Sequence, residues 1–387
     1  MLMAAAILTL LIWAYLLLAR GNFWLIQRPS AGLRTGRPAR IAVIIPARDE
    51  ADVIGKPVQS LLQQTGGHTL RIFLVDDGSS DGTAAVARDA AHAIGRSADL
   101  AIVQAQPLPA GWSGKLWALQ QGVEQAEQWR PDFYLFTDAD VVHAPENVSR
   151  LGAIAEAETR DLVSFMVKLH CETAAEKLLI PAFVYFFFKL YPPAWIADPK
   201  RSAAGAAGGC MLIRPAALLA AGGIAAIRGE VIDDCALAAA VKRQGGRLWL
   251  GASDSAGSIR PYGGFAGIGR MISRSAFNQL RHSLWLLLIA AAGMIATYFL
   301  PVGLTIFSHR LAPALVSGVA WLLMTISFLP ILRMYRLSPL LSLALPLIAL
   351  FYLGATIHSA WRYWAGRGGE WKGRFQDPVR ERHSTGG

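Results

Sequence analysis

The 387-residue sequence has few charged side chains. Asp, Glu, Lys and Arg together make up 17% of the chain, whereas apolar residues make up 53%. An average soluble domain carries about 25% charged residues, so this composition argues against an ordinary soluble enzyme. The shortage of charge instead indicates segments that lie in a lipid bilayer.

Cysteine is also scarce. The three cysteines, Cys171, Cys210 and Cys235, are scattered along the chain and odd in number. They therefore indicate neither a disulfide framework nor a zinc site, which fits a reducing compartment such as the cytoplasm. The sequence contains no nucleic-acid recognition motif, and we expect no nucleic-acid partner despite the net charge of +10.

Four uncharged apolar runs are each about as long as the bilayer requires. A helix needs about 17–25 such residues to cross a hydrocarbon core. The first run could instead be a signal peptide, but it lacks a basic start and a clear cleavage site, which favours an uncleaved anchor. The runs cover residues 2–19, 284–307, 311–332 and 340–357, the last broken by Pro346.

A fifth apolar stretch, residues 178–195, contains Lys189 and three prolines. We interpret it as an interfacial segment or a buried helix and not as a span, because Tyr and Trp prefer the membrane interface. The predicted organisation is an N-terminal transmembrane helix, a cytoplasmic catalytic domain, about three C-terminal transmembrane helices and a basic tail. These parts correspond to residues 1–20, 40–282, 284–358 and 359–387.

The distribution of arginines predicts the orientation in the membrane. Five arginines and no acidic residue lie between the first run and position 40, namely Arg20, Arg28, Arg34, Arg37 and Arg40. Basic flanks stay in the cytoplasm, so we expect a multi-pass protein of the inner membrane with its central domain inside. The basic tail conflicts with four spans, unless the last run is re-entrant or the first run does not span.

Strand-like and helix-like patterns alternate within the 40–282 block. Apolar runs at 41–47, 70–77, 100–106 and 132–140 alternate with helical patterns at 52–64, 82–94 and 114–126. This alternation predicts an α/β fold with a parallel sheet and helices on both faces. Ligands of such sheets bind at the carboxyl ends of the strands. We therefore expect Asp76, Asp77, Asp138 and Asp140 to meet in one cleft.

Each acidic pair suggests its own chemistry. In the segment VDDGSSDGT a tight turn explains Gly78 and Gly82, but not Asp76 and Asp77, which could accept hydrogen bonds from a ribose or a base. Asp138 and Asp140 form an Asp-x-Asp motif whose mutual repulsion needs to be offset. Mg²⁺ or Mn²⁺ held by both residues would do this and would bridge to a phosphate. The alternative is a pair of solvated aspartates in a turn.

Five motifs in order resemble a known family. VIIPARDE, VDDGSSDGT, GWSGKLWAL, FTDAD and VIDDCALA follow one another between residues 41 and 281, and they resemble the family 2 glycosyltransferases of the GT-A fold. With the segment GGCMLIR and the C-terminal apolar runs, the sequence is most similar to the hopene-associated glycosyltransferases. The resemblance implies an inverting, metal-dependent transfer from a nucleotide-sugar, UDP-linked by preference, to a membrane lipid acceptor in hopanoid biosynthesis.

The resemblance also implies roles for individual residues. It implies that Lys115 lies near the phosphates or the sugar, that Asp138 contacts the donor as well as the metal, and that Asp234, beside Asp233, is the general base. A solvated lysine and simple helix capping are the alternatives for these residues. Nucleotide-sugar binding is implied for Pro46, Ala47, Arg48, Asp49, Glu50, Asp76 and Asp77.

One family motif is missing. Processive relatives carry Gln/Arg-x-x-Arg-Trp, whereas this chain has Arg270, Arg274, Gln279, Arg281 and Trp285 without that spacing. These residues could steady a leaving diphosphate or merely flank a membrane span. The difference argues against a long processive product. The remaining alternatives are transfer to polyprenyl phosphate, a glycolipid or a polysaccharide, or a non-catalytic lipid-binding or transport protein.

Overall fold

The computed structural model describes residues 1–29, 37–365, 370–371 and 374–375. They form two compact units, each assembled from separate parts of the chain. The helical unit comprises residues 1–26, 171–194 and 262–369, and the sheet unit comprises 27–170, 195–261 and 370–387. The helices at 171–194 and 262–282 thus belong with the apolar helices and not with the rest of the 40–282 block. Arg34 and most of the basic tail lie outside the described residues.

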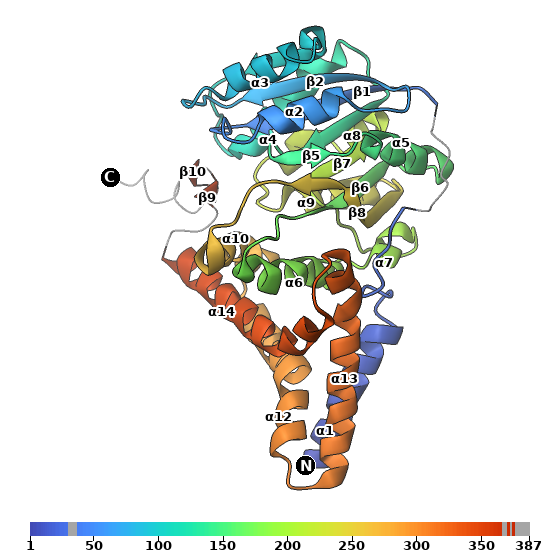
Figure 1. Cartoon of the computed structure of the whole chain (residues 1–387), viewed down its shortest axis with the longest axis vertical. Helices are drawn as coiled ribbons and strands as arrows, with labels where there is room; N and C mark the ends of the chain where they lie inside the picture. The colour runs from blue at the N-terminus through green and yellow to red at the C-terminus, as the bar shows by residue number, and fades with distance from the viewer. Residues whose placement is uncertain (30–36, 366–369, 372–373, 376–387) are drawn as a thin grey trace. The chain divides into compact units, whose positions relative to one another are not determined.

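An eight-stranded sheet with the order β3-β2-β1-β4-β7-β6-β8-β5 forms the sheet unit (Figure 1). Strands β3, β2, β1 and β4 are parallel, as the alternation predicts. β7 is antiparallel to both neighbours and β5 is antiparallel to β8, so the sheet is mixed and not wholly parallel. The strands are β1 (Arg40–Ala47), β2 (Thr69–Asp76), β3 (Leu100–Gln104), β4 (Phe133–Thr137), β5 (Val141–His143), β6 (Leu162–Lys168), β7 (Cys210–Ile213) and β8 (Leu248–Ser258).

Strand direction brings several chain segments to one edge of the sheet. β6 and β8 are parallel to each other and, through β7, run in the same direction as β1 and β4. The carboxyl ends of β1, β2, β4 and β8 therefore share an edge with the amino end of β7, where Thr137 lies opposite Cys210. Loops that leave these strands can meet there even when they are far apart in sequence.

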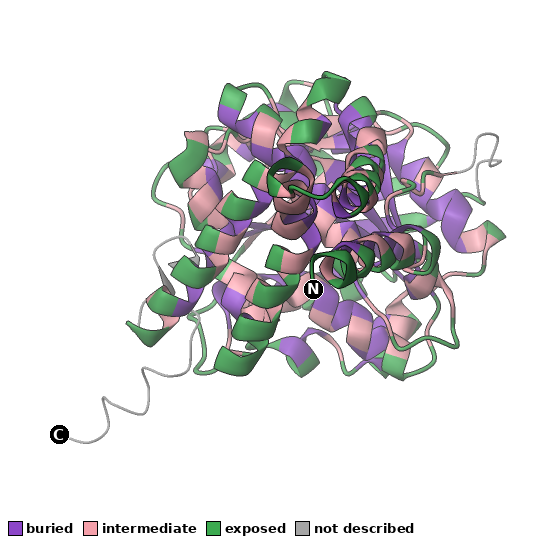
Figure 2. Cartoon of the chain, turned by 90° about the horizontal axis from the view of Figure 1, so that it is seen from below, coloured by how far each residue is buried: buried purple, intermediate pink, exposed green. Residues whose placement is uncertain are grey.

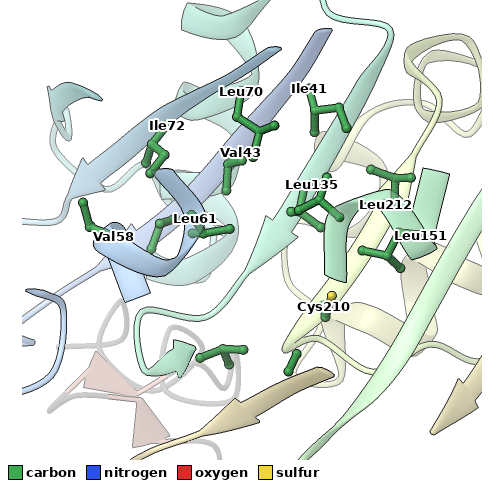
Figure 3. Packing of buried hydrophobic residues seen from close by; sticks show 14 of the residues in the cluster. Ile41, Val43, Val58, Leu61, Leu70, Ile72, Leu135, Leu151, Cys210 and Leu212 are labelled. Carbon is green, nitrogen blue, oxygen red and sulfur yellow. The ribbon is translucent and has the colours of Figure 1, made fainter. Parts of the chain in front are cut away.

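Helices cover both faces of the sheet. Alternate residues of β1, such as Val43, join one apolar core with Val58 and Leu61 of α2 and with Leu151 of α5 (Figure 3). On the other face α4 packs so closely that a Cβ on Gly122 would lie 2.4 Å from Ile44. The helices of this unit are α2 (Gly55–Leu62), α3 (Thr83–His92), α4 (Gly114–Glu127), α5 (Asn147–Ala157), α8 (Pro215–Ala220) and α9 (Asp233–Arg243), with short 3-10 turns at Ser97–Asp99 and Ile224–Ile227.

The helical unit contains most of the apolar sequence. Its elements are α1 (Leu2–Leu18), α6 (Ala174–Leu190), α10 (Gly264–Gln279), α11 (Leu284–Met294), the π-helical η3 (Ile295–Phe299), α12 (Leu300–Phe307), α13 (Leu311–Met334), the 3-10 turn η4 (Pro339–Ala344) and α14 (Leu345–Trp364). The short helix α7 (Pro193–Ala197) follows α6. Many outward residues of these helices are exposed (Figure 2), including Leu288, Phe307, Leu311 and Leu347. Exposed apolar surface on this scale is typical of contact with lipid.

Four helical segments are long and apolar enough to cross a membrane: Ala174–Ala197, Leu284–Phe307, Leu311–Met334 and Pro339–Trp364. They indicate a membrane protein. Three of them match predicted spans. The remaining segment, Ala174–Ala197, contains the 178–195 stretch that we interpreted as unsuited to spanning. It is long enough because Pro181 lies within α6 and does not end the helix. The N-terminal helix α1, at 17 residues, is shorter than the other candidates.

Candidate active site

The loops after β1 and β2 hold each other in place. Arg48 Nη1 donates to the main-chain oxygen of Asp77 at 2.8 Å and lies 3.3 Å from its Oδ2. Asp49 has a φ of 50°, in the left-handed region that Asp tolerates better than most residues. Its Oδ1 accepts a hydrogen bond of 2.9 Å from the Ser80 amide. Arg48, Asp49 and Asp77, which the sequence assigned to nucleotide binding, thus lie together.

Asp76 has a double role in this cluster. Its Oδ1 accepts a 2.9 Å hydrogen bond from the Ser79 amide, so the turn interpretation applies to it in part. Within the described part of the chain, its Oδ2 has only a long contact of 3.5 Å to Gln104 Nε2. Asp76 and Asp77 are each only 5% exposed. Pro46 and Ala47, in contrast, are buried residues of β1. They can therefore present main-chain groups to a ligand more readily than side chains.

Asp138 and Asp140 follow β4 at the same edge. Asp138 Oδ1 lies 3.0 Å from Lys115 Nζ, and Asp140 Oδ2 accepts a 2.7 Å hydrogen bond from Ser258 Oγ. Burial, together with the charge of Asp138, raises the pKa of Asp140. Among the described residues no group of three His, Cys, Asp or Glu side chains could hold a metal. Two carboxylates completed by phosphate oxygens and water do, however, suit Mg²⁺ or Mn²⁺.

Lys115 connects the aspartates after β4 to those of α9. It lies in the first turn of α4, which Ser113 caps through the Leu116 amide. Its Nζ lies 3.0 Å from Asp138 Oδ1 and 3.2 Å from Asp233 Oδ2. Burial alone would lower the pKa of Lys115, but Asp138, Asp233 and Asp234 outweigh burial and hold it above its ordinary value. The structure therefore does not show the solvated lysine that was the alternative.

Asp234 lies against a glycine that precedes β7. The Gly208 amide donates to Asp234 Oδ2 at 2.8 Å, and a Cβ on Gly208 would lie 3.4 Å from both Asp234 Oδ2 and Lys115 Nζ. Asp234 Oδ1 accepts a 2.7 Å hydrogen bond from the Cys235 amide in the first turn of α9. Asp234 therefore also satisfies the helix terminus, as the capping interpretation expected. Burial and the charge of Asp233, opposed by Lys115, raise the pKa of Asp234 to about 6.

The sequence interpretation missed Arg260, two residues beyond the end of β8. Its guanidinium forms an ion pair with Glu50 and lies 3.6 Å from Asp52 Oδ2 and 3.8 Å from Asp140 Oδ2. It thus joins the loop after β1 to the loop after β4. No strand was predicted before Arg260, so the local sequence offered no signal beyond a basic residue followed by Pro261.

A buried polar network behind Asp138 and Asp140 was also missed. His143 lies 3.0 Å from Thr137 Oγ1 through Nε2 and 2.9 Å from Asn147 Nδ2 through Nδ1. Ser255 Oγ donates to Asn147 Oδ1 at 2.6 Å, and Thr137 Oγ1 donates to the Gly209 carbonyl at 2.8 Å. Burial lowers the pKa of His143 to about 3, so this histidine is neutral. The network fixes both ends of the Asp138–Asp140 turn.

The basic and polar residues that stand where processive relatives carry their Gln/Arg-x-x-Arg-Trp motif belong to the helical unit. Arg270, Arg274 and Gln279 lie on α10. Gln279 Oε1 accepts a 2.9 Å hydrogen bond from Tyr191 OH within the same unit. Gln279 thus contributes to the packing of the helices.

Known proteins resemble this arrangement. Residues 42–219 match the model of the family described as Glycosyl transferase family 2. A mannosyltransferase of Pyrobaculum calidifontis, solved with GDP-Man and Mn²⁺, is similar with a TM-score of 0.55 and 17% identity, over 93% of this chain and 99% of that one. A glucosyl-3-phosphoglycerate synthase of M. tuberculosis gives a TM-score of 0.36 and 19% identity, over 61% and 80% of the two chains. No curated protein sequence matches the chain.

The matched segment holds the aspartates after β2 and β4 together with Lys115, whereas Asp233, Asp234 and Arg260 lie beyond it. The similarity to the mannosyltransferase covers nearly the whole of both chains and shows a GT-A fold. Residues 42–219, a little under half of the chain, therefore match a family 2 glycosyltransferase domain, and this match supports glycosyltransferase activity.

Proposed function

We propose that the protein is a membrane-bound, inverting glycosyltransferase that moves a sugar from a UDP-linked donor to a membrane lipid. The observation that carries this proposal is the line of contacts from Asp138 through Lys115 to Asp233, with Asp234 beside it. It joins carboxylates suited to a metal-bound diphosphate to carboxylates suited to proton removal. Sugar transfer to a hydroxyl group needs both.

In the proposed reaction, Asp234 accepts the proton of the acceptor hydroxyl group. The hydroxyl oxygen forms a bond to the anomeric carbon from the side opposite the diphosphate, and the bond from that carbon to the diphosphate oxygen breaks. The nucleoside diphosphate leaves with the bonding electrons, which inverts the anomeric configuration. The raised pKa of Asp234 supports this role, because a weaker acid has a more basic carboxylate.

Donor binding is proposed for the neighbouring loops. Oδ2 of Asp76 has no short contact in the described structure, which suits it to a ribose hydroxyl or a base N–H. Lys115 would stabilise the charge of the diphosphate as it leaves. Asp138 and Asp140 would hold Mg²⁺ or Mn²⁺, and the ion, when bound, would stabilise the same charge. Because the mannosyltransferase structure contains GDP-Man, guanosine donors should be tested beside uridine donors.

A lipid acceptor is proposed because the candidate spans share a chain with the catalytic domain. The resemblance of the motifs to hopene-associated enzymes makes a hopanoid the first lipid to test, with polyprenyl phosphate as the alternative. We place the catalytic domain on the cytoplasmic side of the inner membrane, as the arginines after the first apolar run favour.

The proposal is tested with the purified full-length protein in nanodiscs that contain a hopanoid alcohol, polyprenyl phosphate or diacylglycerol. Radiolabelled UDP-sugars and GDP-Man are supplied with Mn²⁺, and label in the lipid extract is measured. The Asp234→Asn variant serves as the control for enzymatic transfer. Transfer to one lipid identifies the acceptor class. Donor binding without label in any lipid would contradict lipid glycosylation.

A further inference from the structure

Arg260 lies where the donor loop and the aspartates after β4 come closest. It contacts Glu50, and its Nη1 and Nε atoms lie 3.6 Å from Asp52 and 3.8 Å from Asp140. The side chain is 34% exposed, so it is neither a core residue nor a free surface arginine. One guanidinium thus faces three carboxylates from two different loops.

The segment that carries Arg260 is fixed against Asp140. Ser258 Oγ donates to Asp140 Oδ2 at 2.7 Å, and the Ile259 amide donates to the Asp140 main-chain oxygen at 3.0 Å. Glu50 is held from the other side, because its amide donates to Thr83 Oγ1 at 2.8 Å at the start of α3. Since both partners are anchored, the position of the guanidinium follows from the fold.

This position has a consequence for a metal at Asp138 and Asp140. A guanidinium about 4 Å from a carboxylate that also binds a divalent cation repels that cation. A nucleotide diphosphate at the proposed donor site would add negative charge close to both cations and would reduce their repulsion. The metal should therefore bind poorly to the free enzyme and well to the enzyme that holds a nucleotide.

We propose that Arg260 is a positioning residue that neutralises Asp140 and Glu50 in the free enzyme and thereby makes metal binding depend on a bound nucleotide. The inference rests on the proposed donor and metal sites. It predicts opposite effects of one substitution. Without Arg260, Mn²⁺ alone should bind more tightly, whereas the nucleotide should bind more weakly because Glu50 and Asp52 lose their counter-charge. If Arg260 only supports the fold, its removal should weaken the binding of both Mn²⁺ and the nucleotide.

The test measures Mn²⁺ binding to the full-length protein in detergent, from the free-Mn²⁺ signal in electron paramagnetic resonance. Each titration is run alone, with UDP and with GDP. In Arg260→Gln we expect Mn²⁺ alone to bind about five- to tenfold more tightly, and the gain from nucleotide to shrink by a similar factor, within the usual range of coupling between two sites. Arg260→Lys, which keeps the charge, should stay near the wild type. Arg150→Gln, which removes a surface pair with Glu146, is the matched control.

The outcomes separate this inference from the proposed function. Weaker or unchanged binding of Mn²⁺ alone in Arg260→Gln would overturn the role of Arg260. Even if that variant does not fold, a wild-type Mn²⁺ affinity that is independent of nucleotide would overturn the role of Arg260, and with it the shared site proposed for the metal and the diphosphate. If neither Mn²⁺ nor a nucleotide binds the wild type, the proposed function itself fails.

Discussion

The ammonium group of Lys115 lies 3.0 Å from a carboxylate oxygen of Asp138. The same group lies 3.2 Å from Asp233, so a single cation neutralises two acidic segments that are almost a hundred residues apart in sequence. Because the neighbouring carboxylates hold the pKa of Lys115 above its ordinary value, the charge persists over the whole physiological range. Lys115 is therefore a fixed charge in the site and not a proton donor.

Replacing Lys115 by Met should change the pH profile as well as the rate. Lys115 lowers the pKa of Asp234, so its removal should raise that pKa and move the acid limb of kcat to higher pH. We also expect kcat to fall by roughly 10²-fold, as for the loss of one group that stabilises developing charge. Profiles of kcat against pH check this, with Lys115→Arg as the charge-preserving control. An unchanged acid limb in Lys115→Met would separate Lys115 from Asp234.

The metal prediction concerns Asp140. Chelator should abolish transfer, and added Mg²⁺ or Mn²⁺ should restore it, because the leaving diphosphate would otherwise lack the divalent charge and have Lys115 alone as counter-charge. Asp140→Ala should lose activity and Mn²⁺ binding while it stays folded. Asp254→Ala, at a largely exposed residue near Arg28, should behave like the wild type. Full activity of the wild type in excess chelator would rule out the metal.

The third prediction tests the network around His143. His143→Phe keeps a planar ring but leaves Thr137 and Asn147 each without one buried partner. We expect a loss of about 1–3 kcal/mol in the free energy of unfolding, the usual cost of a buried unpaired group, together with weaker Mn²⁺ binding. Thermal unfolding of the full-length protein measures the loss. His92→Phe, at an exposed histidine of α3, provides the control.

The loss of stability in acid should also differ between the wild type and His143→Phe. Burial depresses the pKa of His143 in the folded state, whereas an unfolded histidine titrates near pH 6.5. As the pH falls below about 6.5, the unfolded state gains a proton that the folded state does not, so the wild type loses stability. His143→Phe should lose less stability over that interval. Equal acid sensitivity of the two proteins would mean that His143 is not buried and neutral.

Much of the fold and part of the site could be predicted from the sequence. The first four strands are recognisable as apolar runs that alternate with helical patterns, and β1, β2 and β4 each end close to a pair of acidic residues. Because parallel strands end at one edge, the position of Asp76, Asp77, Asp138 and Asp140 at that edge followed from the alternation of strands and helices. That the four side chains line one cleft stays a prediction. The helix-start position of Lys115 was predicted in the same way.

The parts that were not predicted depend on long-range pairing. Arg260 and Ser255 reach the site only because β8 pairs with β6 and β5, with an irregularity between Met166 and Lys168. No local sequence pattern predicts which residues of these strands pair. The 178–195 stretch was interpreted as a poor span because its prolines suggested breaks, whereas α6 continues through Pro181 and α7 starts at Pro193. Proline is tolerated in helices that pack among apolar neighbours.

The pH dependence of the wild type should report Asp234. Burial and the nearby Asp233 raise its pKa to about 6. A general base must be ionised, so kcat should be constant above that pH and fall about tenfold per unit below it. A kcat that stays level from pH 7 to pH 5 would exclude Asp234 as a base with this pKa. Rates measured at saturating donor and acceptor give the profile.

The decisive substitution is Asp234→Asn, because it keeps the shape of the side chain and removes the proton acceptor. If Asp234 is the base, kcat should fall roughly 10²–10⁴-fold, while the affinity for UDP or GDP changes little. If Asp234 serves only the start of α9, turnover should stay nearly intact, since Asn is as good as Asp at a helix N-terminus. The variant should also be at least as stable as the wild type at pH 7, because ionising a carboxyl group of raised pKa costs the folded state free energy. Asp233→Asn is the matched control, since Asp233 contacts Lys115 from the same helix turn. Collapse of turnover in Asp233→Asn with near-normal turnover in Asp234→Asn would move the base to Asp233, and near-normal turnover in both would refute the mechanism.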